Sequence, residues 1–164
     1  MNFLKIESSS LSNGQGWRVV LWCSGCIHQC YRCQNPESWD PKAGREFTRN
    51  EMDLLIELLK PDYIKGLTIS GGDPLFDGNT ETVTAICREL KEKLPDKDIW
   101  VYTGYEYDAV KDLELMNYID VLIDGRFINS LRNVALAFRG SSNQKVIDVP
   151  ASRKCGGTVT LNVE

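Results

Sequence analysis

Hydrophobic positions along this chain alternate between unbroken apolar runs and apolar residues spaced three or four apart. The unbroken runs, rich in β-branched and aromatic residues, predict buried strands at 17–23, 65–70, 99–103 and 119–123. The spaced residues predict helices between them, with faces formed by Met52, Leu55, Ile56 and Leu59, by Val83, Ile86, Cys87, Leu90 and Leu94, and by Ala109, Val110, Leu113 and Met116. A capping box at 48–51 starts the first helix, and prolines end the first two.

Strands that alternate with helices predict parallel βαβ units and an α/β fold. Because parallel strands end at one face, the motifs that follow them should gather there, namely the cysteine loop, Gly71–Pro74, Thr103-Gly104 and Asp124–Arg126. A closed eight-unit barrel needs about 250 residues. A chain of 164 residues therefore predicts a single domain over 1–164, built as a partial (βα) barrel that is open at one side and can admit a large substrate.

Composition is that of an ordinary globular protein, with 42% hydrophobic and 26% charged residues. A formal net charge of −4 argues against a strong electrostatic hold on nucleic acid. The sequence has no apolar run long enough for a membrane span and no signal-peptide pattern at its start. Its six cysteines are therefore expected in the reducing cytoplasm, where clustered thiols are more often metal ligands than disulfides.

Cys26, Cys30 and Cys33 carry the most specific chemical signal, because gaps of three and two residues separate them. Thiolates at this spacing can hold three irons of a [4Fe–4S] cluster and leave the fourth iron open to a small molecule. Cys23 leaves a four-cysteine zinc site as an alternative, although zinc modules usually separate their cysteine pairs by about a dozen residues or more. At the end of an apolar strand, Cys23 is more simply a buried core residue.

Several other motifs have two interpretations. Gly71-Gly72-Asp73-Pro74 is ordinary turn chemistry, but two glycines beside a cysteine loop also let a ligand approach the backbone closely. Asp124 and Arg126 are either a solvated pair at a strand end or ligand contacts. His28 is expected to order the cysteine loop rather than bind metal, since the thiols already satisfy a cluster.

The last part of the chain is less informative. Residues 139–144 are rich in hydrogen-bonding groups and predict a polar surface loop. The tail after about 150 predicts at most a short strand. Cys155 is too isolated in the sequence to be assigned as a ligand, and the role of the tail stays open.

The cysteine motif followed by a Gly-Gly-Asp turn resembles the radical S-adenosylmethionine (SAM) superfamily. Within it, the chain is similar to the family of small activating proteins of anaerobic ribonucleoside-triphosphate reductase. The similarity runs over roughly residues 10 to 148 and rests on Asn13-Gly14-x-Gly16-x-Arg18, Ser24–Cys30, Asn35–Trp39, Ser70–Leu75, Trp100–Tyr105, Asp124–Phe127 and Arg139–Gln144. The chain departs from the family pattern at Gln15, usually proline, at Tyr31-Arg32, usually Pro-Gly, and at Gln34, often aromatic.

The resemblance implies a partial, laterally open barrel of the radical SAM type and a cofactor-borne mechanism without a catalytic side chain. Cys26, Cys30 and Cys33 would hold one [4Fe–4S] cluster whose open iron chelates SAM. An electron from a donor such as flavodoxin would cleave SAM to methionine and a 5′-deoxyadenosyl radical. That radical would remove hydrogen from a glycine of the reductase's glycyl-radical subunit.

The resemblance also implies where SAM binds. Gly72, with Gly71 and Asp73, would hold its methionine end, and the backbone of Arg32 and Gln34, on either side of Cys33, would border the adenine. The ribose or carboxylate would contact Thr103, Asp124 and Arg126. Other functions stay open: an activase of a different glycyl-radical enzyme, a small-molecule radical SAM synthase, or a ferredoxin-like electron carrier with four cluster ligands.

Overall fold

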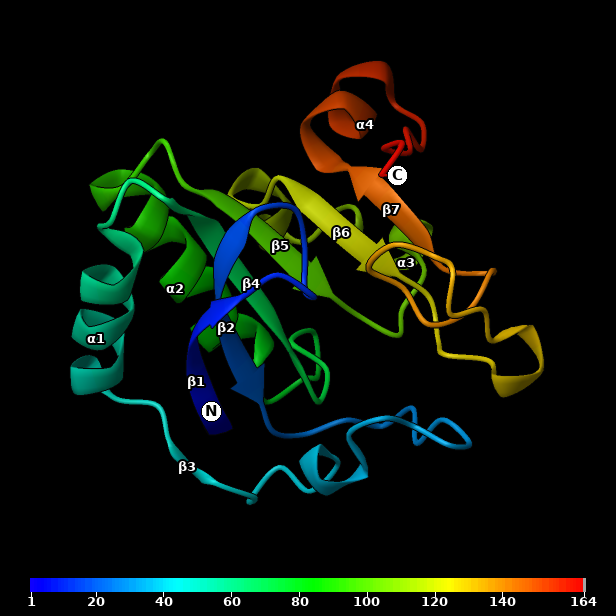
Figure 1. The fold of residues 1–164 in the computed structure, drawn as a ribbon, viewed down its shortest axis with the longest axis horizontal. Coiled ribbons are helices and arrows are strands. Elements are labelled where there is room, and N and C mark those ends of the chain that lie inside the picture. Colours follow the sequence, from blue (N-terminus) through cyan, green and yellow to red (C-terminus); the bar gives the residue numbers. More distant parts are fainter. Residues whose placement is uncertain (164) are drawn as a thin grey trace.

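A computed structural model describes residues 1–163, and its centre is a seven-stranded mixed sheet (Figure 1). The sheet order is β3-β1-β2-β4-β5-β6-β7. Strands β2, β4, β5 and β6 run parallel, whereas β1, β3 and β7 pair antiparallel at the two ends. The strands are β1 (Asn2–Ser10), β2 (Trp17–Cys23), β3 (Arg45–Glu46), β4 (Ile64–Gly71), β5 (Asp98–Tyr102), β6 (Val121–Asp124) and β7 (Lys145–Asp148). The predicted α/β class is confirmed, and the sheet is not closed into a barrel.

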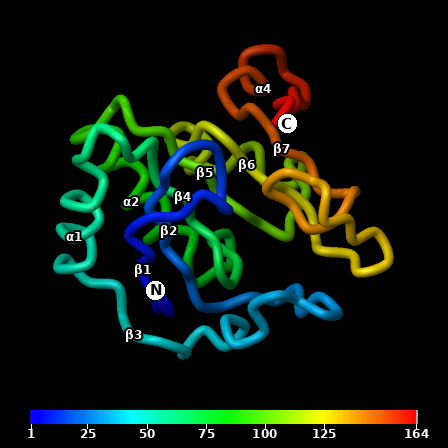
Figure 2. The backbone as a smooth tube through the Cα atoms, in the orientation of Figure 1, coloured from blue at the N-terminus to red at the C-terminus, as the bar shows by residue number. Residues whose placement is uncertain are grey.

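The helices contribute their buried apolar side chains to one cluster on one face of the sheet. Figure 2 traces the chain through α1 and α2 beside the strands of that sheet. The helical elements are α1 (Arg49–Leu59), α2 (Thr80–Lys93), α3 (Tyr107–Val110) and α4 (Val149–Cys155), with 3-10 turns η1 (Pro36–Ser38), η2 (Glu114–Asn117) and η3 (Asn129–Leu131). Within residues 1–163, none of these helices has both the length and the apolar character needed to cross a bilayer.

Local sequence signals explain the two long helices. The Thr48 side chain accepts from the backbone of Asn50, and the Thr48 N–H donates to the Glu51 carboxylate at 2.9 Å, so the predicted capping box forms. On helix α2, Cys87 faces the core together with Val83, Ile86 and Leu90. The prediction that Cys87 is a core residue is confirmed.

The opposite face of the same strands carries aromatic and charged side chains. Arg18 of β2 is fully buried, and its guanidinium lies 2.6 Å from the Asp98 carboxylate. The Arg18 Nε also donates to Thr68 Oγ1 at 2.7 Å, and the guanidinium lies 5.0 Å from the ring centroid of Trp100. The ring of Trp100 packs edge-on against Phe138. A buried charge is tolerated here because it is paired and hydrogen-bonded.

Two sequence-based expectations differ from the structure. The helix predicted over Ala109–Met116 is two short pieces, α3 and η2, because Leu113 is extended between them with a ψ of 142°. Strands β1 and β7 had no predicted counterpart, and the tail forms α4 followed by a single bridge between Thr160 and Ile147. The unbroken apolar runs fit strands that are buried on both faces: helices cover one face, and a second apolar cluster with Trp100, Ile123 and Val146 is buried on the other.

Candidate functional site

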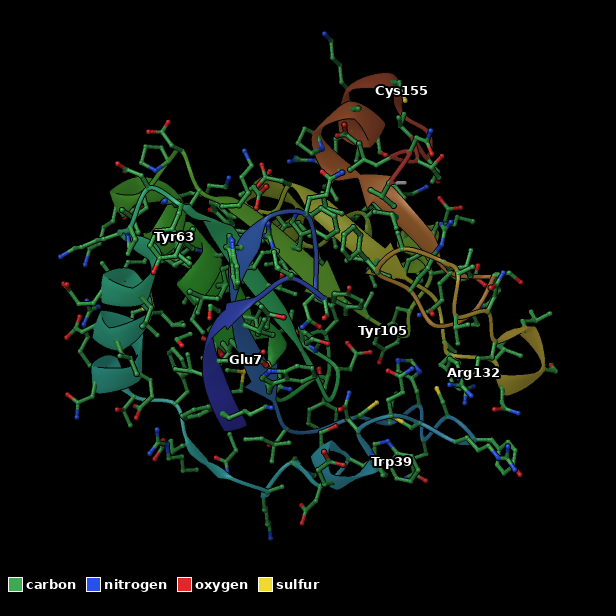
Figure 3. The ribbon with its side chains drawn as sticks, in the orientation of Figure 1. Glu7, Trp39, Tyr63, Tyr105, Arg132 and Cys155 are labelled. Atoms are coloured by element: carbon green, nitrogen blue, oxygen red, sulfur yellow. The ribbon has the colours of Figure 1, made fainter. Side chains whose placement is uncertain are left out.

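A cavity of about 350 Å³ lies where the parallel strands end. Its wall includes Cys26, Cys30, Cys33, Gln34, Gly71, Gly72, Asp73, Thr103 and Arg126, which come from the last residue of β4 and from the segments after β2, β4, β5 and β6. The prediction that these motifs gather at the carboxyl ends of the strands is confirmed. In Figure 3, sulfur atoms lie between the labelled side chains of Trp39 and Tyr105.

Backbone hydrogen bonds fix the start of the cysteine loop against two other segments. The Gly25 N–H donates to the Ser38 carbonyl at 2.7 Å, on the return of the chain through η1. From the other side, the Gly72 N–H donates to the Cys23 carbonyl and the Asp73 N–H to the Gly25 carbonyl, both at 2.8 Å. The Gly-Gly-Asp turn therefore holds the cysteine loop in place.

The two glycines of this turn are required by that close approach. Gly71 has a φ of +104°, and a Cβ there would lie 2.6 Å from the Cys23 carbonyl oxygen. A Cβ at Gly72 would lie 2.5 Å from the Gly25 carbonyl oxygen and 2.9 Å from that of Ser38. Packing thus accounts for both glycines, and the same backbone also lines the cavity.

Asp73 is buried and joins three strand ends through its carboxylate. It accepts from Thr103 Oγ1 and from the Gly104 N–H, both at 2.9 Å, and from the Leu75 N–H at 2.8 Å. Its other contact is the His28 Nε2, at 2.8 Å. The pairing of His28 with Asp73 agrees with the interpretation that His28 orders the cysteine loop.

Arg126 and Asp124 have different positions although they are two residues apart. The Arg126 Nη2 donates to the His28 carbonyl at 2.6 Å, and the side chain lies in the cavity wall. Asp124 is buried outside that wall, and its carboxylate accepts from the backbone N–H groups of Tyr107 at 3.0 Å and Lys145 at 3.1 Å. The structure therefore brings Arg126 to the cysteines and places Asp124 behind them.

Arg32 and Gln34 also differ in their surroundings. Arg32 has a φ of +58°, a region that costs a non-glycine residue about 1–2 kcal/mol. This is a position where the resembled family usually has glycine, so the departure brings local strain. Both residues are exposed; the Arg32 guanidinium lies 5.5 Å from the ring centroid of Tyr31, outside the cavity wall, whereas Gln34 lines the cavity.

The six cysteines fall into three environments. Cys23 and Cys87 are fully buried in the helix-covered apolar cluster, and this burial raises the pKa of both thiols strongly. Cys155 is exposed on α4. Cys26, with Cys30 and Cys33, borders the cavity, and partial burial raises the pKa of the Cys26 thiol. Metal binding requires the thiolate, which an apolar core disfavours, so Cys23 is poorly suited to be a ligand.

A zinc ion and an iron–sulfur cluster require different arrangements of ligands. Over residues 1–163, no three His, Cys, Asp or Glu side chains are arranged around one possible ion position. Zinc needs four ligands within about 2.3 Å of one point, whereas an iron–sulfur cluster gives each cysteine its own iron. Three thiols around a common cavity fit the arrangement expected for a cluster.

Two unpaired donors give an independent test of this fit. Trp39 Nε1 and Arg139 Nε are buried, and neither has a hydrogen-bond acceptor among residues 1–163, although both side chains line the cavity. Buried donors are normally satisfied. A cluster with its sulfur atoms and a cofactor with a carboxylate would both supply acceptors. Sequence reasoning did not assign these two residues to the site, although both lie in segments that carry the resemblance.

Comparisons with known proteins agree with the chemistry of the cavity. A family profile described as "4Fe-4S single cluster domain" matches residues 12–147. Three curated relatives share the name anaerobic ribonucleoside-triphosphate reductase-activating protein. The relative from Enterobacteria phage T4 is 41% identical over 146 residues, covering 89% of this chain and 93% of its own. The Haemophilus influenzae relative is 44% identical over 148 residues (88% and 96%), and that of Escherichia coli K12 is 37% identical over 150 residues (89% and 97%).

These similarities extend over most of each chain and confirm the resemblance found in the sequence. They also agree with a 4Fe-4S domain that spans the cysteine loop and the segments around the cavity. The chain belongs to the family of anaerobic ribonucleoside-triphosphate reductase-activating proteins.

Proposed function

We propose that this protein activates an anaerobic ribonucleoside-triphosphate reductase as a radical SAM enzyme. The observation that carries the proposal is that Cys26, Cys30 and Cys33 line one cavity together with the Gly71-Gly72 backbone. The names of the relatives support the reductase as the partner. The partial barrel of the radical SAM type belongs to the same proposal, with β2, β4, β5 and β6 as its parallel strands.

In this proposal Cys26, Cys30 and Cys33 are the only protein ligands of one [4Fe–4S] cluster. The other cysteines are unsuited, because two lie in the apolar core and Cys155 lies on α4, outside the cavity wall. When bound, the cluster and SAM would supply the radical chemistry: with one electron from a donor such as flavodoxin, they would provide the 5′-deoxyadenosyl group that takes a hydrogen atom from a glycine Cα of the reductase.

The chain's own residues bind and orient these groups. The Gly72 backbone, with Gly71, holds the methionine end of SAM, and Gln34 borders the adenine along with the Arg32 backbone. Three side chains, those of Asp73, Thr103 and Asp124, form hydrogen bonds that position the loops. Arg126 lies in the cavity wall, where it can contact bound SAM. The mouth of the cavity is where a glycine-bearing segment of the reductase enters, and water is excluded once both partners are docked.

The direct test mixes the cluster-loaded protein with an anaerobic ribonucleotide reductase, SAM and a reductant. Electron paramagnetic resonance should detect a glycyl radical on the reductase, and the Cys30→Ala protein should produce none. Rapid SAM cleavage without a radical on the reductase would contradict the proposal and favour a small-molecule radical SAM enzyme.

A further inference from the structure

The backbone just before Arg139 is strained. Phe138 has a φ of +58°, which is rare for an aromatic residue. Two contacts hold it there: its carbonyl accepts from the Tyr102 hydroxyl at 2.7 Å, and its ring packs edge-on against Trp100 at 5.5 Å. Such strain persists only where the surroundings over-determine it, and it clusters at ligand sites. Here it places Arg139 in the cavity wall.

Hydrogen bonds also fix the backbone that follows Arg139. The Gly140 N–H at 2.9 Å and the Ser141 N–H at 3.1 Å both donate to the Gln144 side-chain oxygen. The ring of Phe127 would lie 2.9 Å from a Cβ at Gly140, so the chain passes close to it. The Arg139 side chain therefore extends from a backbone that is fixed on both sides, as a preorganised ligand contact requires.

Three arginines of this part of the molecule, Arg18, Arg126 and Arg139, differ in the acceptors that their N–H groups have. Arg18 is paired with Asp98 and donates to Thr68. Arg126 donates to the His28 carbonyl. The Nε of Arg139 is buried and has no acceptor within residues 1–163. A buried donor left without a partner is destabilising, so this nitrogen is the one expected to gain an acceptor when the cavity is filled.

SAM carries a sulfonium, an ammonium and one anionic group, its carboxylate. Asp73 also lies in this wall, but its carboxylate is already used by the protein, because it accepts from Thr103 and Gly104 and contacts His28. Arginine binds carboxylates through paired, charge-assisted N–H···O bonds. We propose that Arg139 binds the carboxylate of SAM, a role that rests on the proposed function and that the resemblance had assigned, with the ribose, to Thr103, Asp124 and Arg126.

The test compares two ligands and measures binding without turnover. SAM and decarboxylated SAM share the sulfonium and the adenosine, and only SAM has the carboxylate. Each is titrated anaerobically, without reductant, into the cluster-loaded protein and followed by calorimetry. Arg139→Gln should weaken SAM binding about tenfold to a hundredfold and leave the binding of decarboxylated SAM within about twofold, as expected for one charge-assisted hydrogen-bonded pair.

Two further variants serve as controls. Arg132→Gln removes an exposed arginine from the same segment, outside the cavity wall, and should leave both affinities unchanged (Figure 3). Arg139→Lys keeps the charge but loses the planar fork, so SAM binding should be intermediate. Iron content and thermal unfolding of each variant report whether the fold and the cluster are retained.

The outcomes separate the inference from the proposed function. If the unaltered protein does not bind SAM, the proposed function fails and the inference fails with it. If the unaltered protein prefers SAM and Arg139→Gln keeps the same preference, only the inference is overturned. Equal weakening of both ligands, or loss of the cluster in both the Gln and Lys variants, would also overturn it, because Arg139 would then shape the cavity rather than bind the carboxylate.

Discussion

The two faces of the central sheet carry different chemistry although the same strands form both. On the helix-covered face, β4 presents Leu67 and Ile69 and β5 presents Ile99 and Val101, all buried among the apolar sides of the helices. Alternate residues point to the other face, which carries Thr68, Trp100 and Tyr102 together with Arg18. The first face is packed entirely under helices, whereas the second combines a smaller apolar cluster with polar side chains and leads to the cavity.

The features that cost stability gather on the cavity face and in its loops. They include the buried Arg18–Asp98 pair, the positive φ values of Arg32 and Phe138, and the unpaired donor of Arg139. Violations of local rules are expected at functional sites, where the rest of the fold compensates for them. The comparison shows that stability and chemistry are divided between two faces of one sheet and not between two domains.

The largest expected effect separates cysteines on the two faces. Replacing Cys26, Cys30 or Cys33 with alanine should abolish the cluster, because each would remove the ligand of one iron. Cys23→Ala on the helix-covered face should keep the cluster and lose only about 1 kcal/mol of folding stability, as expected for a small buried truncation. Iron and sulfide analysis after anaerobic reconstitution, with thermal unfolding, checks both. A full cluster in Cys30→Ala with none in Cys23→Ala would reverse the assignment.

The buried ion pair should give the next largest effect. Arg18→Met leaves the Asp98 carboxylate, which is 26% exposed, without its partner. Breaking such a pair should lower the free energy of unfolding by about 3 kcal/mol, measured by urea denaturation. Adding Asp98→Asn should restore part of the loss, because the unpaired charge is then removed. If the double variant is no more stable than Arg18→Met alone, the pair is not the reason for the loss.

A smaller effect is expected at the turn that touches the cysteine loop. Gly72→Ala places a methyl group 2.5 Å from the Gly25 carbonyl oxygen, so the cysteine loop must shift. We expect lower cluster content and about tenfold weaker SAM binding, since about 1.4 kcal/mol of lost interaction has that effect. Gly157→Ala is the matched control, because a Cβ there has no neighbour within 4 Å. A Gly72→Ala protein with full cluster and unaltered SAM affinity would show that the loop tolerates the methyl group.

Sequence reasoning succeeded where the signal is local. The capping box at Thr48, the core position of Cys87 and the clustering of strand-end motifs all depend on spacing along the chain, and the structure confirms them. The antiparallel partners β1 and β7 could not be predicted in this way, because their pairing depends on residues far away in the sequence. The unpaired Nε of Arg139 is equally hard to predict, since only the fold shows that no acceptor from residues 1–163 lies beside it.

The smallest expected effect concerns cysteines away from the cavity. Burial raises the pKa of the Cys87 thiol, so even mildly alkaline solution leaves it protonated, and the core denies access to reagents. Cys155 is exposed at the end of α4, where its thiol donates to the carbonyls of Ser152 and Gly157. Iodoacetamide should therefore modify Cys155 in the native protein and Cys87 only after unfolding, as mass spectrometry of peptides would show. Cys155→Ser should retain full cluster content and unchanged reductase activation, since Cys155 is not among the residues that line the cavity. Loss of the cluster in Cys155→Ser would mean that the chemistry extends beyond the cavity face, and the division between the two faces would have to be redrawn.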